Sequence, residues 1–141
     1  MKISATGLEL IKQHEGLRLA AYQDSVGVWT IGYGSTRGVT CAMEINQAEA
    51  DERLRRDVET AEKCVNNSVS VDMSQGMFDA LCSFVFNLGC RAFGNSKLLR
   101  KLNAGDDDGA AQEFLRWDHA GGKKLAGLTA RRKHEQEVFL A

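Results

Sequence analysis

A glycine-punctuated stretch at residues 17–40 lies between two segments of helical periodicity, and it is the part of the chain that most restricts the fold. Runs of β-branched and aromatic residues such as Val28-Trp29-Thr30-Ile31 are separated there by Gly27, Gly32, Gly34 and Gly38. Such runs favour β-strands, and the glycines favour turns between them. We therefore expect a small antiparallel sheet of two or three short strands. A sheet of this size is marginally stable alone, so it must pack on a helix.

The flanking segments predict helices, and the chain contains no proline. Ser4 or Thr6 can cap a first helix that ends near Glu15-Gly16. Asn46 and Glu49 have the spacing of a capping box, which predicts the start of a long helix that runs to about Asn66.

The C-terminal half predicts four more helices. Residues 75–88 are apolar around most of the helix circumference, which is typical of the central helix of a lobe, capped by Ser74 and ended by Gly89. A short helix is expected from Ser96 to Leu102. Another begins at the acidic run of residues 106–108 and reaches about Trp117. After a break at Gly121-Gly122, we expect a last helix capped by Thr129.

These patterns predict an α+β fold that is predominantly helical. The 141 residues, 43% of them hydrophobic, suffice for one domain with a buried core. Within this single domain, 1–141, we expect a small N-terminal lobe with the sheet at about residues 15–60. The larger helical lobe would comprise residues 1–14 and 61–141, and the long helix would join the two.

The charge balance argues against a polyanionic partner. The formal net charge is -1, although residues 91–141 carry 10 basic against 7 acidic side chains. We interpret this basic third as solvated surface, with a weak attraction to an anionic cell wall as the alternative. Neither an apolar signal segment nor a membrane-spanning run is recognisable, so we expect the protein to accumulate in the cytoplasm, with no nucleic-acid partner and no membrane insertion.

The four cysteines do not predict a metal site, because none forms a C-x-x-C pair and no His has a ligand spacing from them. Cys82 and Cys90 should lie too far apart on one helix to form a disulfide. A disulfide between Cys41 and Cys64 is conceivable, and the sequence alone does not decide it. Our expectation is four reduced, mostly buried thiols.

Three polar residues in the first quarter could carry chemistry. Glu15 would lie at the end of the first helix, Asp24 in a turn and Thr30 in a strand. Partial burial disfavours ionisation of a carboxyl group, as a general acid needs, and glycosidic cleavage needs two carboxyl groups that face each other across the sugar. Each residue alone also fits a structural role: a helix-terminal surface Glu, a turn Asp and a β-forming Thr.

The sequence E-G-L-R-L-x-x-Y-x-D-x-x-G-x-W-T-I-G-Y-G, from Glu15 to Gly34, resembles the phage-type lysozymes, glycoside hydrolase family 24, the endolysins of tailed phages. Residues 79–89, D-A-L-C-S-F-V-F-N-L-G, resemble the central helix of the family's larger lobe. Residues 93–106 resemble its next helix, and residues 116–135 are similar to the end of the lambdoid-phage members.

This resemblance implies a muramidase that cuts peptidoglycan between N-acetylmuramic acid and N-acetylglucosamine, without metal or cofactor. Glu15 would be the general acid and Asp24 the second carboxylate, while Thr30 would help to hold the attacking water. Inversion would require carboxyl groups roughly 6.5–9.5 Å apart. By the same resemblance, the protein would be a monomer that a separately encoded holin releases from the host cytoplasm.

The resemblance assigns the other positions less specifically. Phe86 and Ser96 would line the saccharide cleft, although an apolar Phe on the central helix fits a core role equally well. Arg131 or Arg132 would pair with Glu15, and the sequence leaves the choice open. Family members often carry a His after the T-I-G-x-G segment, where this chain has Ser35, so a hydrogen bond or ion pair to a carboxylate would be missing.

Three alternative functions fit the sequence less well. A wall-binding module with a lost active site is disfavoured, because all three catalytic residue types are present. Lytic transglycosylation typically needs a single carboxyl group, so Asp24 and Thr30 favour hydrolysis. A thiol hydrolase that uses His14, His119 or His134 lacks any Cys/His motif context.

Overall fold

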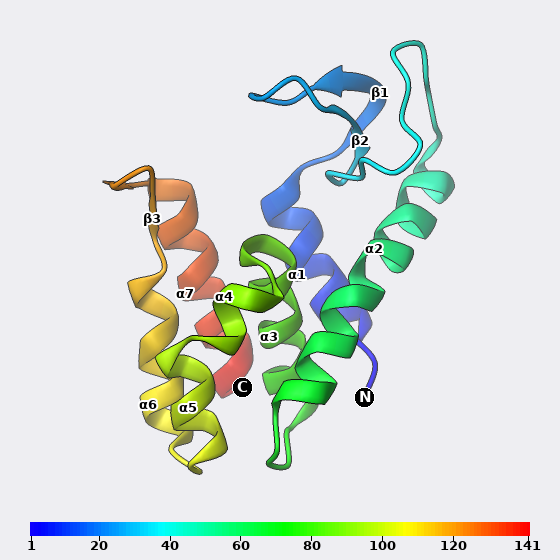
Figure 1. The fold of residues 1–141 in the computed structure, drawn as a ribbon. Coiled ribbons are helices and arrows are strands. Elements are labelled where there is room, and N and C mark those ends of the chain that lie inside the picture. The colour runs from blue at the N-terminus through cyan, green and yellow to red at the C-terminus, as the bar shows by residue number, and fades with distance from the viewer. The chain divides into compact units, whose positions relative to one another are not determined.

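The computed structural model describes the whole chain, residues 1–141, and has an α+β fold that is predominantly helical (Figure 1). The helices are α1 (Ala5–Glu15), α2 (Gln47–Ser68), α3 (Gln75–Leu88), α4 (Cys90–Gly94), α5 (Lys97–Asn103), α6 (Asp107–Glu113), the 3-10 helix η1 (Phe114–Arg116) and α7 (Ala126–Leu140). The strands are β1 (Arg18–Gln23), β2 (Trp29–Gly32), β3 (His119–Ala120) and β4 (Lys123–Lys124). No helix is long and apolar enough to cross a membrane.

The chain divides into two compact units. We call Lys12–Glu59 the sheet unit, because it contains β1 and β2. The helical unit combines Met1–Ile11 with Thr60–Ala141. The helices α1 and α2 each contribute residues to both units.

The sheet unit is built on an antiparallel hairpin and the first half of α2. In the hairpin, Tyr22 lies opposite Thr30 and Gln23 lies opposite Trp29. The predicted capping box is confirmed: Glu49 N donates to Asn46 Oδ1 at 2.8 Å, and Asn46 N donates to Glu49 Oε1 at 3.3 Å. The hydrophobic core of this unit is formed by Ile31, Ile45, Ala50, Leu54 and Val58.

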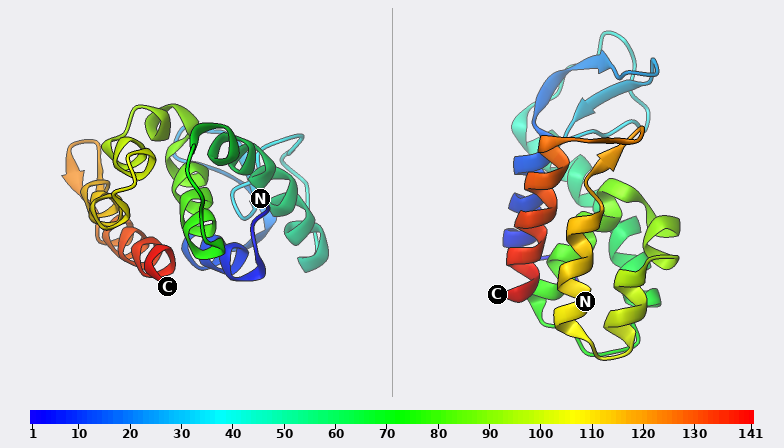
Figure 2. Two further views of the ribbon diagram at one scale, coloured as in Figure 1. Left: turned by 90° about the horizontal axis from the view of Figure 1, so that it is seen from below. Right: turned by 90° about the vertical axis from the view of Figure 1, so that its left-hand side faces the viewer.

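The helical unit is organised around α3, which packs against α7 and α4 (Figure 2). Phe84, fully buried on α3, makes edge-to-face contacts with Phe93 at 6.1 Å, Phe114 at 5.6 Å and Trp117 at 5.5 Å between ring centroids. Ser74 caps α3 as predicted, since its side chain accepts from Met77 N. The positive φ of 94° at Gly89 ends the helix.

Two expectations about the C-terminal part are wrong. The last helix begins at Ala126 with Leu125 at the N-cap position, and the Thr129 hydroxyl instead donates to Asp118 Oδ2 at 3.2 Å. Gly121 and Gly122 do not simply break the chain. Both have positive φ, and they form the turn of a second hairpin, β3–β4.

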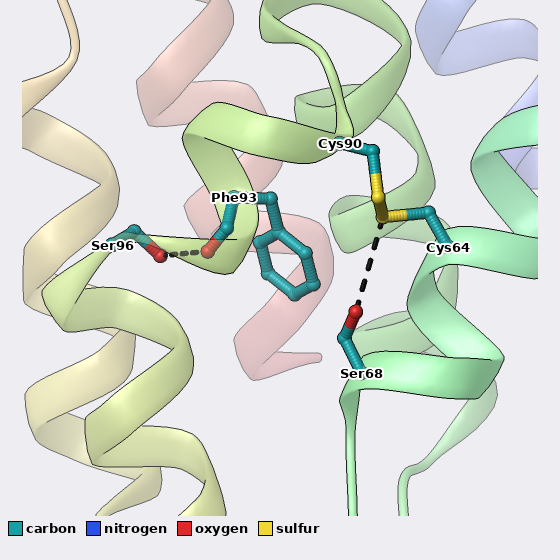
Figure 3. Close-up of a disulfide and its surroundings, with 5 residues drawn as sticks. All are labelled: Cys64, Ser68, Cys90, Phe93 and Ser96. Atoms are coloured by element: carbon teal, nitrogen blue, oxygen red, sulfur yellow. Dashed lines mark hydrogen bonds between the residues drawn. A yellow bond between two sulfur atoms is a disulfide. The ribbon is translucent and has the colours of Figure 1, made fainter.

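The expectation of four reduced thiols is also wrong, because Cys64 on α2 and Cys90 at the start of α4 form a disulfide (Figure 3). The predicted alternative partner of Cys64, Cys41, is free and exposed, and Cys82 is free and buried. Gly89 ends α3 one residue before Cys90, so Cys90 does not continue the helix that carries Cys82. The two bonded Cα atoms are 5.9 Å apart, within the range of disulfides.

Candidate active site

The three candidate catalytic residues all belong to the sheet unit. Glu15 is the last residue of α1, Asp24 directly follows β1, and Thr30 lies on β2. The hairpin register, with Gln23 opposite Trp29, places Asp24 at the first position of the turn between the strands. The fold therefore supplies the three side chains from three neighbouring elements of one compact unit.

Asp24 holds the turn with one carboxylate oxygen. Its Oδ1 accepts hydrogen bonds from Val26 N at 3.0 Å and Val28 N at 2.8 Å, while the side chain is exposed. Its Oδ2 makes no hydrogen bond within the protein. The structural role that Asp commonly has in turns is thus present, and it orients the carboxylate with one oxygen available to solvent.

Thr30 is buried, with 4% of its surface exposed. Its hydroxyl donates to the backbone carbonyl of Val28 at 2.9 Å. Because that bond uses the only hydroxyl proton, the lone pairs of Oγ1 remain as acceptors for a water molecule. Asp24 and Thr30 are linked through one residue, since Val28 N donates to Asp24 and Val28 O accepts from Thr30.

Glu15 is half-buried and lies against the backbone of Gly34. A Cβ atom placed on Gly34 would be 3.3 Å from Glu15 Oε1, and Gly34 has a φ of +88°. Both facts favour glycine at position 34, because any other residue would be strained and would crowd the carboxyl group. The glycine that ends the W-T-I-G-Y-G motif therefore makes room for the predicted general acid.

The two predicted saccharide-contacting residues lie in the helical unit. Phe86 is half-buried on α3. Ser96 is buried, and its hydroxyl donates to Phe93 O at 2.6 Å and accepts from Leu99 N at 3.1 Å, which caps α5. The structure thus gives Ser96 a capping role that its sequence motif did not suggest, and contact of either residue with a sugar stays a prediction.

Arg131 and Arg132 both contact Glu135 in the interior of the helical unit. Arg131 Nε lies 3.3 Å from Glu135 Oε2, and Arg132 Nε lies 2.8 Å from Oε1. Ser83 also donates to Glu135 Oε2 at 2.6 Å, and Arg132 donates to Asn87 Oδ1 at 2.7 Å. Burial raises the pKa of Glu135, whereas Arg132, Arg131 and Ser83 lower it. This network was not predicted from the sequence, although the spacings of three and four residues on one helix favour contacts of Arg131 and Arg132 with Glu135.

No group of three or more His, Cys, Asp or Glu side chains is arranged to hold a metal ion.

Comparison with known proteins identifies the family. A family model described as phage lysozyme matches residues 12–135. The endolysin of Acyrthosiphon pisum secondary endosymbiont phage 1 is 46% identical over 143 residues, which cover 99% of this chain and 98% of the relative.

Two solved structures are also similar over nearly the full length. The muramidase domain of SpmX from Asticaccaulis excentricus is 42% identical with a TM-score of 0.94, covering 99% of this chain and 98% of that one. A mutant of P22 lysozyme is 40% identical with a TM-score of 0.92, covering 100% and 99%. The matched family model and the similarity to a muramidase domain identify a glycoside hydrolase of the lysozyme class. The chain belongs to the phage lysozyme family.

Proposed function

We propose that this chain is an endolysin that hydrolyses the β-1,4 bond between N-acetylmuramic acid and N-acetylglucosamine in peptidoglycan. The observation that carries the proposal is the grouping of Glu15, Asp24 and Thr30 on α1, the hairpin turn and β2 of the sheet unit. Full-length similarity to an endolysin and to a muramidase domain supports the same substrate.

In the proposed reaction, Glu15 donates its proton to the glycosidic oxygen as the bond from C1 to that oxygen breaks. A water molecule attacks C1 from the opposite face and gives a proton to Asp24. The arrangement around Asp24 supports this role, since one carboxylate oxygen is held by the turn and the other is available to solvent. The acceptor lone pairs of Thr30 would orient that water.

This mechanism inverts the configuration at C1 and yields a reducing end that carries a hydroxyl group at C1. Retention would need carboxyl groups only about 5–5.5 Å apart and a covalent intermediate. Lytic transglycosylation would release a 1,6-anhydro product instead. NMR of the first product anomer and mass spectrometry of the released muropeptides distinguish the three outcomes.

We propose that Arg131 or Arg132 is the cationic partner of Glu15. Both guanidinium groups are buried and contact Glu135; Arg131 also binds Ser83, and Arg132 also binds Asn87. Replacement of the partner, by Arg131→Gln or Arg132→Gln, should lower activity more than it lowers thermal stability. Replacement of the other arginine should act mainly through stability, because Glu135 loses an ion pair. Equal ratios of activity loss to stability loss in the two variants would contradict the proposal.

We further propose that the enzyme acts as a monomer and reaches the wall from the host cytoplasm through a separately encoded holin. Cells that express the chain alone should then lyse only after the inner membrane is permeabilised. Lysis without permeabilisation would show another route of export.

Replacement of the general acid tests the function. Glu15→Gln should lower the rate of hydrolysis of purified peptidoglycan by at least about 100-fold, because the amide cannot donate the proton. Circular dichroism and thermal unfolding check that the fold is retained. The matched control is Glu59→Gln, the same change on an exposed residue of α2. Undiminished activity of Glu15→Gln would refute the assignment.

A further inference from the structure

A cavity of about 250 Å³ lies within the sheet unit and is lined mainly by residues with charged side chains. None of the proposed catalytic residues lines it. One wall comes from α2, whose lining residues are spaced three to four positions apart and so share one helix face. The other wall comes from the loop that follows β2. The lining residues are Ser35, Arg37, Glu49, Glu52, Arg53, Arg56 and Asp57.

Two of the three arginines are already engaged within the protein. Arg53 donates to Ser35 Oγ at 3.3 Å and to the backbone carbonyl of Arg37 at 2.9 Å. Arg56 pairs with Glu52 at 2.9 Å, and both of these side chains are exposed. The expected absence of a bond from position 35 to a carboxylate is wrong, since Ser35 forms a hydrogen bond with Asp57 and also accepts one from Arg53.

Asp57 and Arg37 are different, because neither side chain forms an ion pair. Asp57 is half-buried, and burial raises its pKa, whereas a hydrogen bond with Ser35 and the charges of Arg37 and Arg53 lower it. Two opposite charges thus line one cavity and interact electrostatically without a direct ion pair. A partly buried carboxylate without an ion-pair partner costs stability, and such costs are common at binding sites.

The cavity is close in the chain to the proposed catalytic residues. Ser35 directly follows Gly34, whose backbone lies against Glu15, and Ser35 forms an antiparallel bridge with Ile31, the neighbour of Thr30. A group bound here would therefore contact the segment that positions the general acid.

We propose that this cavity binds a zwitterionic group, with its ammonium at Asp57 and its carboxylate at Arg37. The volume is slightly below that of typical ligand pockets, about 300 Å³ and above, and suits a group of amino-acid size. A lone anion would meet Asp57, Glu49 and Glu52, and a metal cation would meet three arginines. The identity of the group rests on the proposed function. If the chain cuts peptidoglycan, the group is the amino-acid end of a peptide stem on that polymer.

Binding is tested with free meso-diaminopimelic acid, followed by NMR chemical-shift changes in the intact protein. We expect saturable binding that shifts Ser35, Arg37 and Asp57. Pimelic acid, which lacks the ammonium groups, and 1,5-diaminopentane, which lacks the carboxylates, should each bind about tenfold more weakly or worse. No saturable binding, or equal binding of all three probes, would overturn the proposal.

Matched variants locate the site. Asp57→Asn and Arg37→Gln should each raise the dissociation constant at least about tenfold, and Arg37→Gln keeps the backbone carbonyl that Arg53 uses. The controls are Glu59→Gln and Arg55→Gln, which make comparable charge changes at exposed α2 residues outside the cavity. Equal effects of the controls would overturn the assignment to this cavity.

Kinetics separate this proposal from the proposed function. On peptide-bearing glycan, Arg37→Gln should raise KM several-fold with little change in kcat, and on peptide-free glycan it should change neither. Unchanged KM on both glycans would overturn the stem-peptide assignment while the muramidase function stands. Failure of the wild-type protein to cut either glycan would instead refute the proposed function, and the binding of free diaminopimelic acid would still be decided by the titration.

Discussion

Gly34 illustrates, at the scale of one residue, how a backbone position can set the place of a candidate catalytic side chain. Its positive φ and its close approach to Glu15 Oε1 are two separate requirements for glycine. Gly38 shares only the first: its φ is +66°, and nothing lies within 4 Å of a Cβ placed there. A comparison of substitutions at Gly34 and Gly38 therefore separates the effect of backbone strain from the effect of crowding the carboxyl group.

Gly34→Ala should lower activity by roughly tenfold or more beyond Gly38→Ala, because the new methyl group displaces the Glu15 carboxyl and small displacements of reacting groups are costly. Both variants should lose similar stability, about 1–2 kcal/mol, from strain at positive φ. Initial rates on peptidoglycan and thermal unfolding measure the two effects. Equal activity in the two variants would show that contact with Gly34 does not position Glu15.

At the scale of secondary-structure elements, α2 uses polar and charged residues for two purposes: to begin the helix and to line a cavity. Its capping box begins the helix, and its cavity-facing side holds Asp57 beside Ser35 and Arg37. Since burial raises the pKa of Asp57, the protonated form is favoured in the folded state. The resulting stabilisation is complete below the unfolded-state pKa of about 3.9 and is lost as the pH rises through the raised folded-state value.

Asp57→Asn should therefore gain stability relative to the wild type as the pH rises from about 4 to 7, because the amide does not ionise. The change in this difference should stay below about 1 kcal/mol, since Asp57 is only half-buried and screened by water. Thermal or urea unfolding of both proteins across this pH range measures it. The other titrating groups are shared, so they cancel in the comparison. A difference independent of pH would contradict the raised pKa.

For the molecule as a whole, the Cys64–Cys90 disulfide is the covalent constraint on the folded chain. It joins α2 to α4 across a sequence separation of 26 residues, and a loop of that length corresponds to about 3.5 kcal/mol in the chain-entropy model. That amount is a large fraction of the 5–15 kcal/mol by which a domain is typically stable. The bond therefore matters more for stability than for the chemistry, since neither cysteine is a candidate catalytic residue.

The double variant Cys64→Ser/Cys90→Ser should unfold at a clearly lower temperature than the wild type, with a loss of about 3.5 kcal/mol in the free energy of unfolding. Cys41→Ser is the matched control, because Cys41 is free and exposed, and it should leave stability unchanged. Thiol titration gives an independent measurement. The native protein should expose one reactive thiol, Cys41; denaturation should add Cys82, whose pKa burial raises; and reduction should add the other two. Four reactive thiols without reductant would disprove the disulfide.

The α+β class, most helix starts and the resemblance to the family could be predicted from sequence patterns alone. These depend on local signals: the capping residues Ser74 and Asn46 act within four positions, the glycines act on their own φ, and the motif from Glu15 to Gly34 is contiguous. The partner of Cys64, the hydrogen bond from Ser83 to Glu135 and the cavity at Asp57 required the tertiary structure. Each joins side chains from elements distant in the chain, and no local preference specifies which distant residues meet when the core packs.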